Sequence, residues 1–392
     1  MRCIPSKLDS RYGQGRVTSN VNSEEAVNVF VLLGHDFGAN TWQRKHALGL
    51  IPGLNDRLAY GYYRAAGGGW SVEYSEDSDE GRFGRVGRLA LRKLLGFDLI
   101  HVWHNRRRLL ASDIVWTHTE LEHLGVLALF GLLRQRHRPK LIANCVWLFD
   151  RWPHLSRIRR SLYQQLLKRA DLVTTLSPEN RKVARQLLPS VRCECVLIGA
   201  MPQKMASPRK RTVHQTVRIA SLGSDMHRDW ETFLAAFGNV PRYEVRIASS
   251  KINRRLIAGL NNVQVIPAQT ADDVMSLYEW ADLVVVPLKP NLHASGITVV
   301  FEATVSAVPL ICTDTGGLRA YFSDAEVAYV PPYAPLTMRA AVEELSKDDE
   351  RRFSMIVNAQ RRMISADLTA QGYAMRNRRL SEELLSNSET VL

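Results

Sequence analysis

Short apolar runs recur along the first half of the chain, and stretches with helical spacing separate them. The first run, Val27–Leu33, is apolar at nearly every position, which is typical of a parallel strand covered by helices on both faces. Four similar runs are expected to be strands: Phe97–Trp103, Asp113–Thr117, Lys140–Trp147 and Asp171–Thr175. Helices are expected at Arg85–Leu95, Leu121–Arg136 and Leu155–Arg169. This alternation predicts an open α/β sheet.

The alternation restarts after residues 201–216, a polar and basic segment without periodicity that we interpret as a linker. Strands are expected at Val217–Leu222, Tyr243–Ala248, Val263–Ile266, Leu283–Pro287, Val308–Cys312 and Val327–Val330. Helices are expected at Glu231–Phe237, Ile252–Gly259, Ala271–Trp280 and Thr298–Ala307, and from Leu336 to the end the sequence is helical and polar. We therefore predict two Rossmann-like, doubly wound domains, 27–200 and 217–370, flanked by a flexible tail (1–26) and a C-terminal helical tail (371–392).

The distribution of charge differs between the two halves. The 392 residues carry a formal net charge of +13, with 45% apolar residues, a composition that excludes disorder throughout. Residues 1–200 hold 30 Lys and Arg against 18 Asp and Glu, whereas residues 201–392 hold 22 against 21. Only the first domain is therefore expected to have an anionic partner.

Neither the cysteines nor the amino terminus indicates export. The five cysteines are scattered, without a disulfide framework or zinc-site spacing, and Cys193 and Cys195 are expected to be buried thiols. Residues 1–26 contain no apolar run of the signal-peptide type, and Leu124–Leu133 is too short to cross a bilayer. A reduced, cytoplasmic setting is expected.

The segment Pro287–Ala303 has the pattern of a phosphate site. A strand ends at its start, a loop with Ser295 and Gly296 follows, and a helix begins near Thr298. Free backbone N–H groups and the positive end of a helix dipole at a sheet edge bind phosphate oxygens. Glu302 lies about one turn further along and could accept hydrogen bonds from a ribose. The alternative is that Ser295 caps a helix and Glu302 is solvated.

The same region resembles a known family. The passage "ADLVVVPLKP…SGITVVFEATVSAVPLICTDTGGLRAYF" is similar to the donor site of glycosyltransferase family 4, retaining enzymes of the GT-B type. The resemblance implies two domains facing a central cleft and assigns Glu302 to the nucleotide ribose. The first glutamate of the family's pair falls on Ala294, so this chain departs from the pattern where the donor sugar is held. His293 and Ser295 flank that position and are the candidates to replace it.

A second match is Ser221–Phe237, "SLGSDMHRDWETFLAAF", which resembles the opening of the family's second domain. Ser224 stands where the family usually has an arginine, and Arg228 lies near the position of its lysine. The resemblance implies that Arg228 binds the donor diphosphate, with His227 as a further candidate. The alternative is a surface arginine paired with Asp229 or Glu231.

In this fold the acceptor binds the carboxyl edge of the first sheet. The candidate loops are Gly34–Asn40, His104–Arg108, His118–Glu122 and Asp150–His154. The candidate catalytic residues are His118, Asp150 and Arg228. The donor-binding candidates are Gly38, His227, Arg228, His293, Ser295, Gly296, Thr298 and Glu302. The resemblance implies front-side attack with retention, in which the leaving phosphate takes the proton, so neither a metal nor another cofactor is expected.

The basic excess of the first domain is concentrated in Arg106–Arg108, Arg134–Lys140 and the amphipathic segment Arg157–Arg169. An anionic membrane surface with a lipid-linked saccharide acceptor would explain these charges, and a solvated charged face is the alternative. No nucleic-acid-binding signature is present.

The sequence thus predicts a hexosyltransferase on the inner face of the membrane. It would transfer a sugar from a UDP-sugar or GDP-sugar donor in surface-polysaccharide biosynthesis. A nucleotide-sugar epimerase and a non-catalytic binding protein of the same fold remain alternatives.

Overall fold

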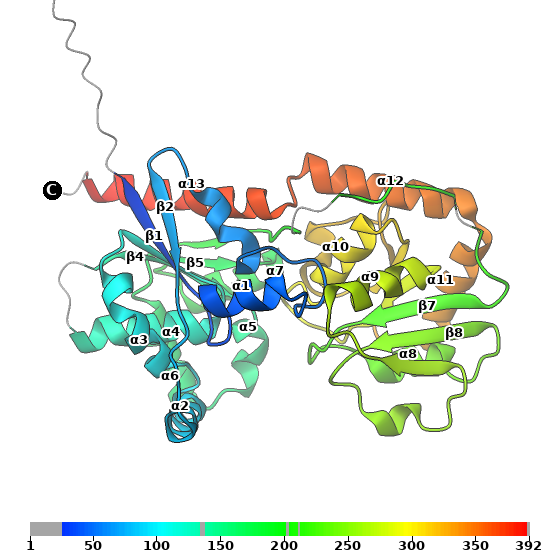
Figure 1. The fold of residues 1–392 in the computed structure, drawn as a ribbon, viewed down its shortest axis with the longest axis horizontal. Coiled ribbons are helices and arrows are strands. Elements are labelled where there is room, and N and C mark those ends of the chain that lie inside the picture. The colour runs from blue at the N-terminus through cyan, green and yellow to red at the C-terminus, as the bar shows by residue number, and fades with distance from the viewer. Residues whose placement is uncertain (1–25, 134–137, 201–203, 211, 390–392) are drawn as a thin grey trace, which may run out of the picture.

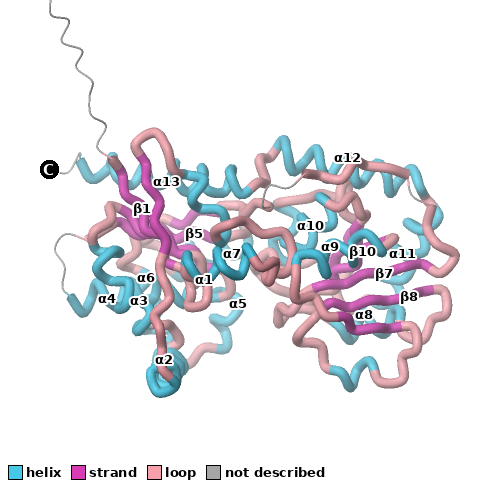
Figure 2. Tube along the Cα trace, in the orientation of Figure 1, coloured by secondary structure: helices cyan, strands magenta, loops and turns pink. Residues whose placement is uncertain are grey.

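The computed structural model describes residues 26–133, 138–200, 204–210 and 212–389, with side chains up to residue 386. Two α/β domains lie side by side, each built on a six-stranded parallel sheet with helices on its faces (Figures 1 and 2). The predicted fold, two Rossmann-like domains of the GT-B type, is confirmed. The predicted tail 1–26 lies outside the described residues except for residue 26, as do residues 201–203 and 211 of the predicted linker.

The first sheet has the strand order β2-β1-β3-β4-β5-β6, and every neighbouring pair is parallel. Its strands are β1 (Val27–Leu32), β2 (Trp70–Tyr74), β3 (Ile114–Thr117), β4 (Lys140–Cys145), β5 (Leu172–Thr175) and β6 (Cys193–Cys195). Its helices are α1 (Ala39–Ala47), η1 (Ala59–Ala65), α2 (Arg82–Leu95), α3 (Leu99–Leu110), α4 (Glu120–Leu133), α5 (Leu148–Arg151), η2 (Trp152–His154), α6 (Arg157–Leu167) and α7 (Pro178–Leu187).

One strand predicted for this domain is wrong. The apolar run Phe97–Trp103 forms the start of helix α3, because the side chain of Asp98 accepts a hydrogen bond from His101 N and caps the helix. The apolar residues then follow helical spacing, with Val102 buried and Trp103 half exposed. The true edge strands β2 and β6 were missed because they are short and carry polar residues.

Helix α6 also differs from its expected role. Tyr163, Leu166 and Leu167 are buried in the core of the first domain, so the apolar side of this basic helix faces inward. Two apolar side chains of the helix remain exposed, Ile158 at 82% and Leu162 at 36%. The expectation that the apolar face of Arg157–Arg169 contacts a membrane is therefore wrong, because the domain core already covers that face.

The second sheet has the order β12-β11-β10-β7-β8-β9 and is also parallel throughout. Its strands are β7 (Val217–Leu222), β8 (Tyr243–Ala248), β9 (Val263–Ile266), β10 (Leu283–Val286), β11 (Leu310–Thr313) and β12 (Ala328–Val330). Its helices are α8 (Trp230–Phe237), η3 (Arg254–Ile257), α9 (Ala271–Trp280), α10 (Ile297–Val305), η4 (Gly316–Ala320), α11 (Pro335–Lys347) and α12 (Asp349–Ser365). The predicted helix Ile252–Gly259 is only the short 3₁₀ turn η3, ended by Gly259 at φ +79°.

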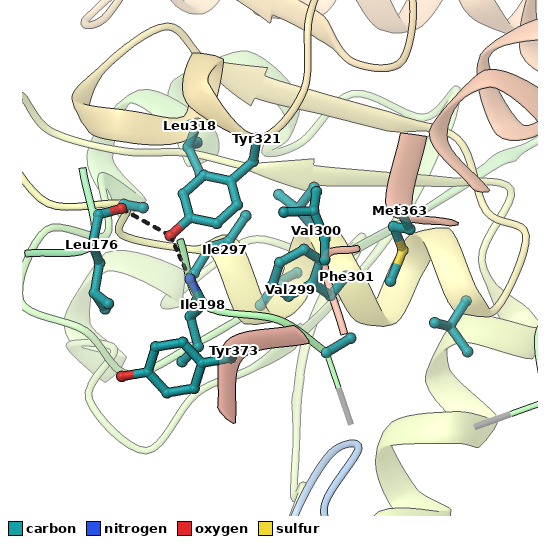
Figure 3. Close-up of a cluster of buried hydrophobic side chains, with 14 of the residues drawn as sticks. Leu176, Ile198, Ile297, Val299, Val300, Phe301, Leu318, Tyr321, Met363 and Tyr373 are labelled. Atoms are coloured by element: carbon teal, nitrogen blue, oxygen red, sulfur yellow. Dashed lines mark hydrogen bonds between the residues drawn. The ribbon is translucent and has the colours of Figure 1, made fainter. Parts of the chain in front are cut away.

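A shared hydrophobic cluster joins the two domains (Figure 3). The hydroxyl of Tyr321, in the second domain, donates to Leu176 O at the end of β5, 2.8 Å away. It also accepts from Ile198 N at 3.2 Å, and Phe301 of α10 packs on its ring edge. The domains therefore share buried apolar surface as well as a chain connection.

The last helix, α13 (Ala370–Glu389), returns to the first domain, along which it runs in Figure 1. The hydroxyls of Tyr373 and Tyr62 lie 2.9 Å apart, and Trp116 Nε1 donates to Ser381 Oγ at 2.9 Å. Where the chain crosses between domains, Ala200 N donates to Leu368 O and Ala370 N to Ala200 O. The two crossings are thus hydrogen-bonded to each other and form a single hinge.

Within the described residues, no helix combines the length and hydropathy that a membrane span requires.

We expect Tyr373→Ala to lower the free energy of unfolding by about 3 kcal/mol or more, because it leaves a cavity and removes the buried hydrogen bond between the hydroxyls of Tyr373 and Tyr62. Urea unfolding followed by tryptophan fluorescence measures this loss. Arg379→Ala is the matched control on α13, since that side chain is 83% exposed, and it should change stability by less than about 0.5 kcal/mol. Equal losses in the two variants would contradict an integral role for α13.

Candidate functional site

The amino end of α10 lies at the carboxyl edge of the second sheet, directly after β10. Gly296 is its N-cap, with φ +84°, a left-handed conformation that favours glycine. A Cβ at this position would lie 2.8 Å from Val286 Cγ1 and 3.2 Å from an Arg228 nitrogen. The first N–H groups of a helix have no partner within it, so this end is suited to an anion.

Arg228 is a buried cation beside that helix end, with 6% of its surface exposed. Its Nε donates to Leu222 O at 2.9 Å, and a terminal nitrogen donates to Ser295 Oγ at 3.4 Å. Burial lowers the pKa of its guanidinium, partly offset by the more distant carboxylate of Asp225. Among the described residues, no carboxylate lies within ion-pairing distance of Arg228.

The alternative for Arg228, a surface ion pair with Asp229 or Glu231, is wrong. The side chain of Asp229 instead caps α8 and accepts from Thr232 N and Oγ1. A buried charge without a counter-ion is costly, so the guanidinium favours the binding of an anion. Ser295, Gly296 and Arg228, all identified as candidates in the sequence, lie together here.

A network of carboxylates and imidazoles connects the two domains at the same edge. Asp150 of the first domain accepts from Leu292 N at 2.6 Å and from His293 Nδ1 at 2.8 Å. His293 Nε2 lies 3.5 Å from a carboxylate oxygen of Asp225, whose other oxygen accepts from the backbone N–H and ring of His227. His293 and His227 thus face each other across Asp225, with ring centroids 5.0 Å apart.

The contacts within this network shift the pKa values of His293, Asp150 and Asp225. Burial alone would disfavour the imidazolium, but hydrogen bonds to Asp150 and Asp225 outweigh it and raise the pKa of His293 to about 9. Against the effect of burial, the hydrogen bonds from His293 hold the pKa of Asp150 below its usual range. In the same way, hydrogen bonds from His227 and His293 hold the pKa of Asp225 well below its usual range. At neutral pH the cleft therefore holds a cationic His293 between two carboxylates.

The same residues are the ones that could hold a metal ion. Asp225, His227 and His293 form the group of His, Cys, Asp and Glu side chains, within the described part of the chain, whose ligand atoms lie within 4.8 Å of one another. A ligating histidine must be neutral, and the raised pKa of His293 makes a proton a strong competitor at Nε2. The absence of a metal requirement stays a prediction.

Glu302 lies further along α10 and is enclosed by protein groups. One carboxylate oxygen accepts from Leu54 N at 3.1 Å and the other from Tyr278 Oη at 2.8 Å. Burial raises the pKa of this carboxyl. A Cβ on Gly53 would lie 2.1 Å from a carboxylate oxygen, so the first-domain segment 52–55 lies directly against Glu302. In this conformation the segment covers the carboxylate of Glu302.

A pocket of about 700 Å³ adjoins Glu302 and the exposed side chain of Thr298. Trp42 and Tyr60 of the first domain line its other side, together with residues 198–200 of the hinge. The indole of Trp42 donates to Asp56 O at 2.9 Å, so the ring is tied to the segment that covers Glu302.

His118 lies in the first domain, apart from this set. Its Nδ1 is 2.9 Å from Tyr62 Oη, its ring stacks on Tyr60 with centroids 3.4 Å apart, and burial lowers its pKa to about 3. A second pocket of about 660 Å³ is lined by His118 together with Glu122, Arg92 and Trp147. At neutral pH this imidazole is uncharged and can act as a hydrogen-bonding group in that pocket.

Gly38, predicted to bind the donor, caps α1. A Cβ there would lie 2.6 Å from Asp77 N, so the glycine permits close packing of the loop before α2. Two residues of the site, Asp225 and Leu54, were not predicted from the sequence. The only sequence signal for Asp225 is its nearness to His227. The contact of Leu54 with Glu302, 248 positions away, has no local signal in the sequence.

We expect the contribution of His293 to stability to depend on pH. A pKa raised from 6.5 to about 9 corresponds to about 3 kcal/mol favouring the folded imidazolium, present in full below pH 6.5 and lost as the pH rises through about 9. The difference in unfolding free energy between wild type and His293→Gln should therefore shrink between pH 6.5 and 9.5, as measured by urea unfolding. His214→Gln, a half-exposed histidine paired with Asp282, is the control. A difference independent of pH would contradict the ion-pair network.

Residues 249–362 match the sequence family described as "Glycosyl transferases group 1". No curated protein matches the sequence. Among solved structures, the chain is similar to sucrose-phosphate synthase from Thermosynechococcus elongatus, with TM-score 0.69 and 16% identity over 92% of this chain and 100% of that one. It is also similar to HepE from Anabaena in complex with UDP-glucose, with TM-score 0.63 and 14% identity over 92% and 99%. These similarities support the two-domain fold.

Proposed function

We propose that this protein is a glycosyltransferase that moves a sugar from a nucleotide-sugar donor to a lipid-linked saccharide acceptor. The matched family segment, residues 249–362, contains β10 and α10 and hence Ser295 and Gly296 of the anion site, while Arg228 precedes this segment. The structures of similar fold include one bound to UDP-glucose, which favours UDP as the nucleotide, with GDP as the alternative. The reaction is proposed to proceed with retention, as a step of surface-polysaccharide synthesis at the inner face of the membrane.

The observation that carries this proposal is the buried guanidinium of Arg228 at the amino end of α10. A cation with 6% exposure, beside a helix N-terminus and without a carboxylate in ion-pairing distance among the described residues, is matched to a diphosphate. In the transfer step, negative charge accumulates on the leaving diphosphate. Arg228, Ser295 and the helix end would stabilise that charge and so lower the barrier.

His293 is proposed to act at the sugar end of the donor. Ala294, at the position of the family's first glutamate, has no polar side-chain group, whereas the imidazolium of the adjacent His293, which is equally buried, lies between Asp150 and Asp225. Asp150 orients the ring through Nδ1 and is thus a positioning residue. The neutral His118 would hydrogen-bond an acceptor hydroxyl in the first-domain pocket. The proposal includes no metal or other cofactor.

A non-catalytic binding protein is the second candidate. The specific observation that favours it is the closed state of Glu302, whose two oxygens already bind Leu54 N and Tyr278 Oη. A chain that binds no nucleotide could retain this arrangement permanently. Nucleotide binding therefore separates the two candidates.

We expect Arg228→Gln to weaken binding of the preferred nucleotide sugar about tenfold or more, because it removes charge-assisted hydrogen bonds to the diphosphate. Calorimetry with a panel of nucleotides and nucleotide sugars measures this effect. Arg242→Gln is the matched control, since Arg242 is exposed and precedes β8 at the opposite edge of the same sheet. Circular dichroism verifies that both variants are folded.

Binding of no nucleotide by the folded wild type would refute the transferase and favour the binding protein. If a donor binds, the anomeric configuration of the product, determined by NMR, tests retention.

We also expect nucleotide binding to displace the segment that covers Glu302. If ribose hydroxyls replace the N–H of Leu54 as donors to the carboxylate, that amide loses its partner and exchanges faster with solvent. Hydrogen exchange followed by mass spectrometry over residues 49–56 measures this, with strand β4 as the internal control. Slower exchange in residues 49–56 would show instead that the segment closes over the nucleotide and that Glu302 is not its ribose acceptor.

A further inference from the structure

Helix α2 is exposed over most of its surface. Arg88 is its one buried side chain, and it pairs with Glu80 and with Asp98, each at 2.6 Å. Figures 1 and 2 show the helix at the lower end of the first domain in this view. The helix is therefore held to the domain by a buried ion-pair cluster, and its apolar face does not serve as the attachment.

The apolar face of α2 points into solvent. Phe83, Val86, Ala90 and Leu94 share one side of the helix by their spacing. Phe83 is 95% exposed, Val86 66% and Leu94 72%. A helix on the surface of a globular protein usually turns such a face inward, and a contiguous exposed apolar face marks an interaction surface.

The charges on helix α2 itself have one sign. Helix α2 carries Arg82, Arg85, Arg92 and Lys93 in addition to the buried Arg88, and it contains no acidic residue. The adjoining first turn of α6 adds exposed Arg157 and Ile158, and Arg159 of that helix donates to the carbonyl oxygens of Lys93 and Leu94. Basic side chains flanking an exposed apolar stripe are complementary to a bilayer that contains anionic lipids.

We infer that α2 is the element by which the first domain docks on an anionic bilayer, with Phe83, Val86 and Leu94 inserted at the level of the headgroups. Insertion would remove these side chains from water, while Arg82, Arg85 and Lys93 would contact lipid phosphates. The inference locates the membrane contact on α2, in place of the apolar face of α6, which the domain core covers.

The same helix also contributes to the first-domain pocket. Arg92, on the side of α2 opposite Phe83, lines the pocket that contains His118 and Trp147. Docking through α2 would therefore place a cation of the pocket close to the membrane surface. There it could meet the phosphate of a lipid-linked acceptor. This part of the inference rests on the proposed function, whereas the docking of α2 does not.

Vesicle flotation of the full chain tests the docking, with phosphatidylcholine vesicles that contain or lack phosphatidylglycerol. We expect the wild type to bind the anionic vesicles and to dissociate as salt is raised. The double variant Phe83→Glu/Val86→Glu should bind at least about tenfold more weakly, because two exposed apolar contacts become anionic. The matched control is Leu336→Glu/Ile364→Glu in the second domain, where the side chains are 75% and 69% exposed, and it should bind like the wild type.

Three results would overturn the inference: no vesicle binding by the wild type, equal binding by the α2 variant, or equal loss in the control. A fourth is self-association of the wild type in sedimentation velocity that the α2 variant abolishes, since a second copy would then cover the face. Nucleotide binding by calorimetry in the same variants keeps the two proposals distinguishable. Unchanged nucleotide binding with lost flotation supports docking, and retained flotation without nucleotide binding refutes only the transferase.

Discussion

The contact between Asp150 and His293 is the interaction on which the cleft depends. It joins the first domain to the loop before α10 through two hydrogen bonds, to the His293 ring and to Leu292 N. Because both partners are buried, the imidazolium and the carboxylate each require the other, and separating them would leave uncompensated charge. The loop that carries Ser295 and Gly296 is thereby fixed against the first domain, and the amino end of α10 is held at the cleft.

The charge balance of this cleft explains its chemistry. Asp225 and Asp150 both pair with His293, while Arg228 has no carboxylate within ion-pairing distance among the described residues. Internal ion pairs therefore compensate the charge of His293, whereas the guanidinium of Arg228 still favours an anionic ligand. The segment 52–55 covers Glu302 within the expected nucleotide site. A nucleotide could therefore reach this carboxylate only if the segment moved.

The first domain has a separate asymmetry. Its basic excess, +12 in residues 1–200, is distributed over several elements, but α2 is the basic helix whose apolar face carries Phe83, Val86 and Leu94, each at least 66% exposed. The buried Arg88 anchors the helix in this orientation. Since α2 also contributes Arg92 to the pocket with His118, the docking surface and the candidate acceptor pocket share one rigid element.

The sequence by itself determined the fold class and most of the strands, because buried parallel strands are continuous apolar runs whose signal is local. The strand–loop–helix pattern also identified Ser295 and Gly296, and the family resemblance identified Arg228; the structure brings them together because β7 and β10 are neighbouring strands. The sequence-based assignment failed at Phe97–Trp103, where a helix-capping aspartate outweighed an apolar run, and at the edge strands β2 and β6. Only the tertiary structure decided that Asp150 meets His293, that segment 52–55 covers Glu302, and that α2 rather than α6 exposes its apolar face. Each of these depends on residues distant in sequence or on which side of a helix the core covers, and no local pattern encodes either.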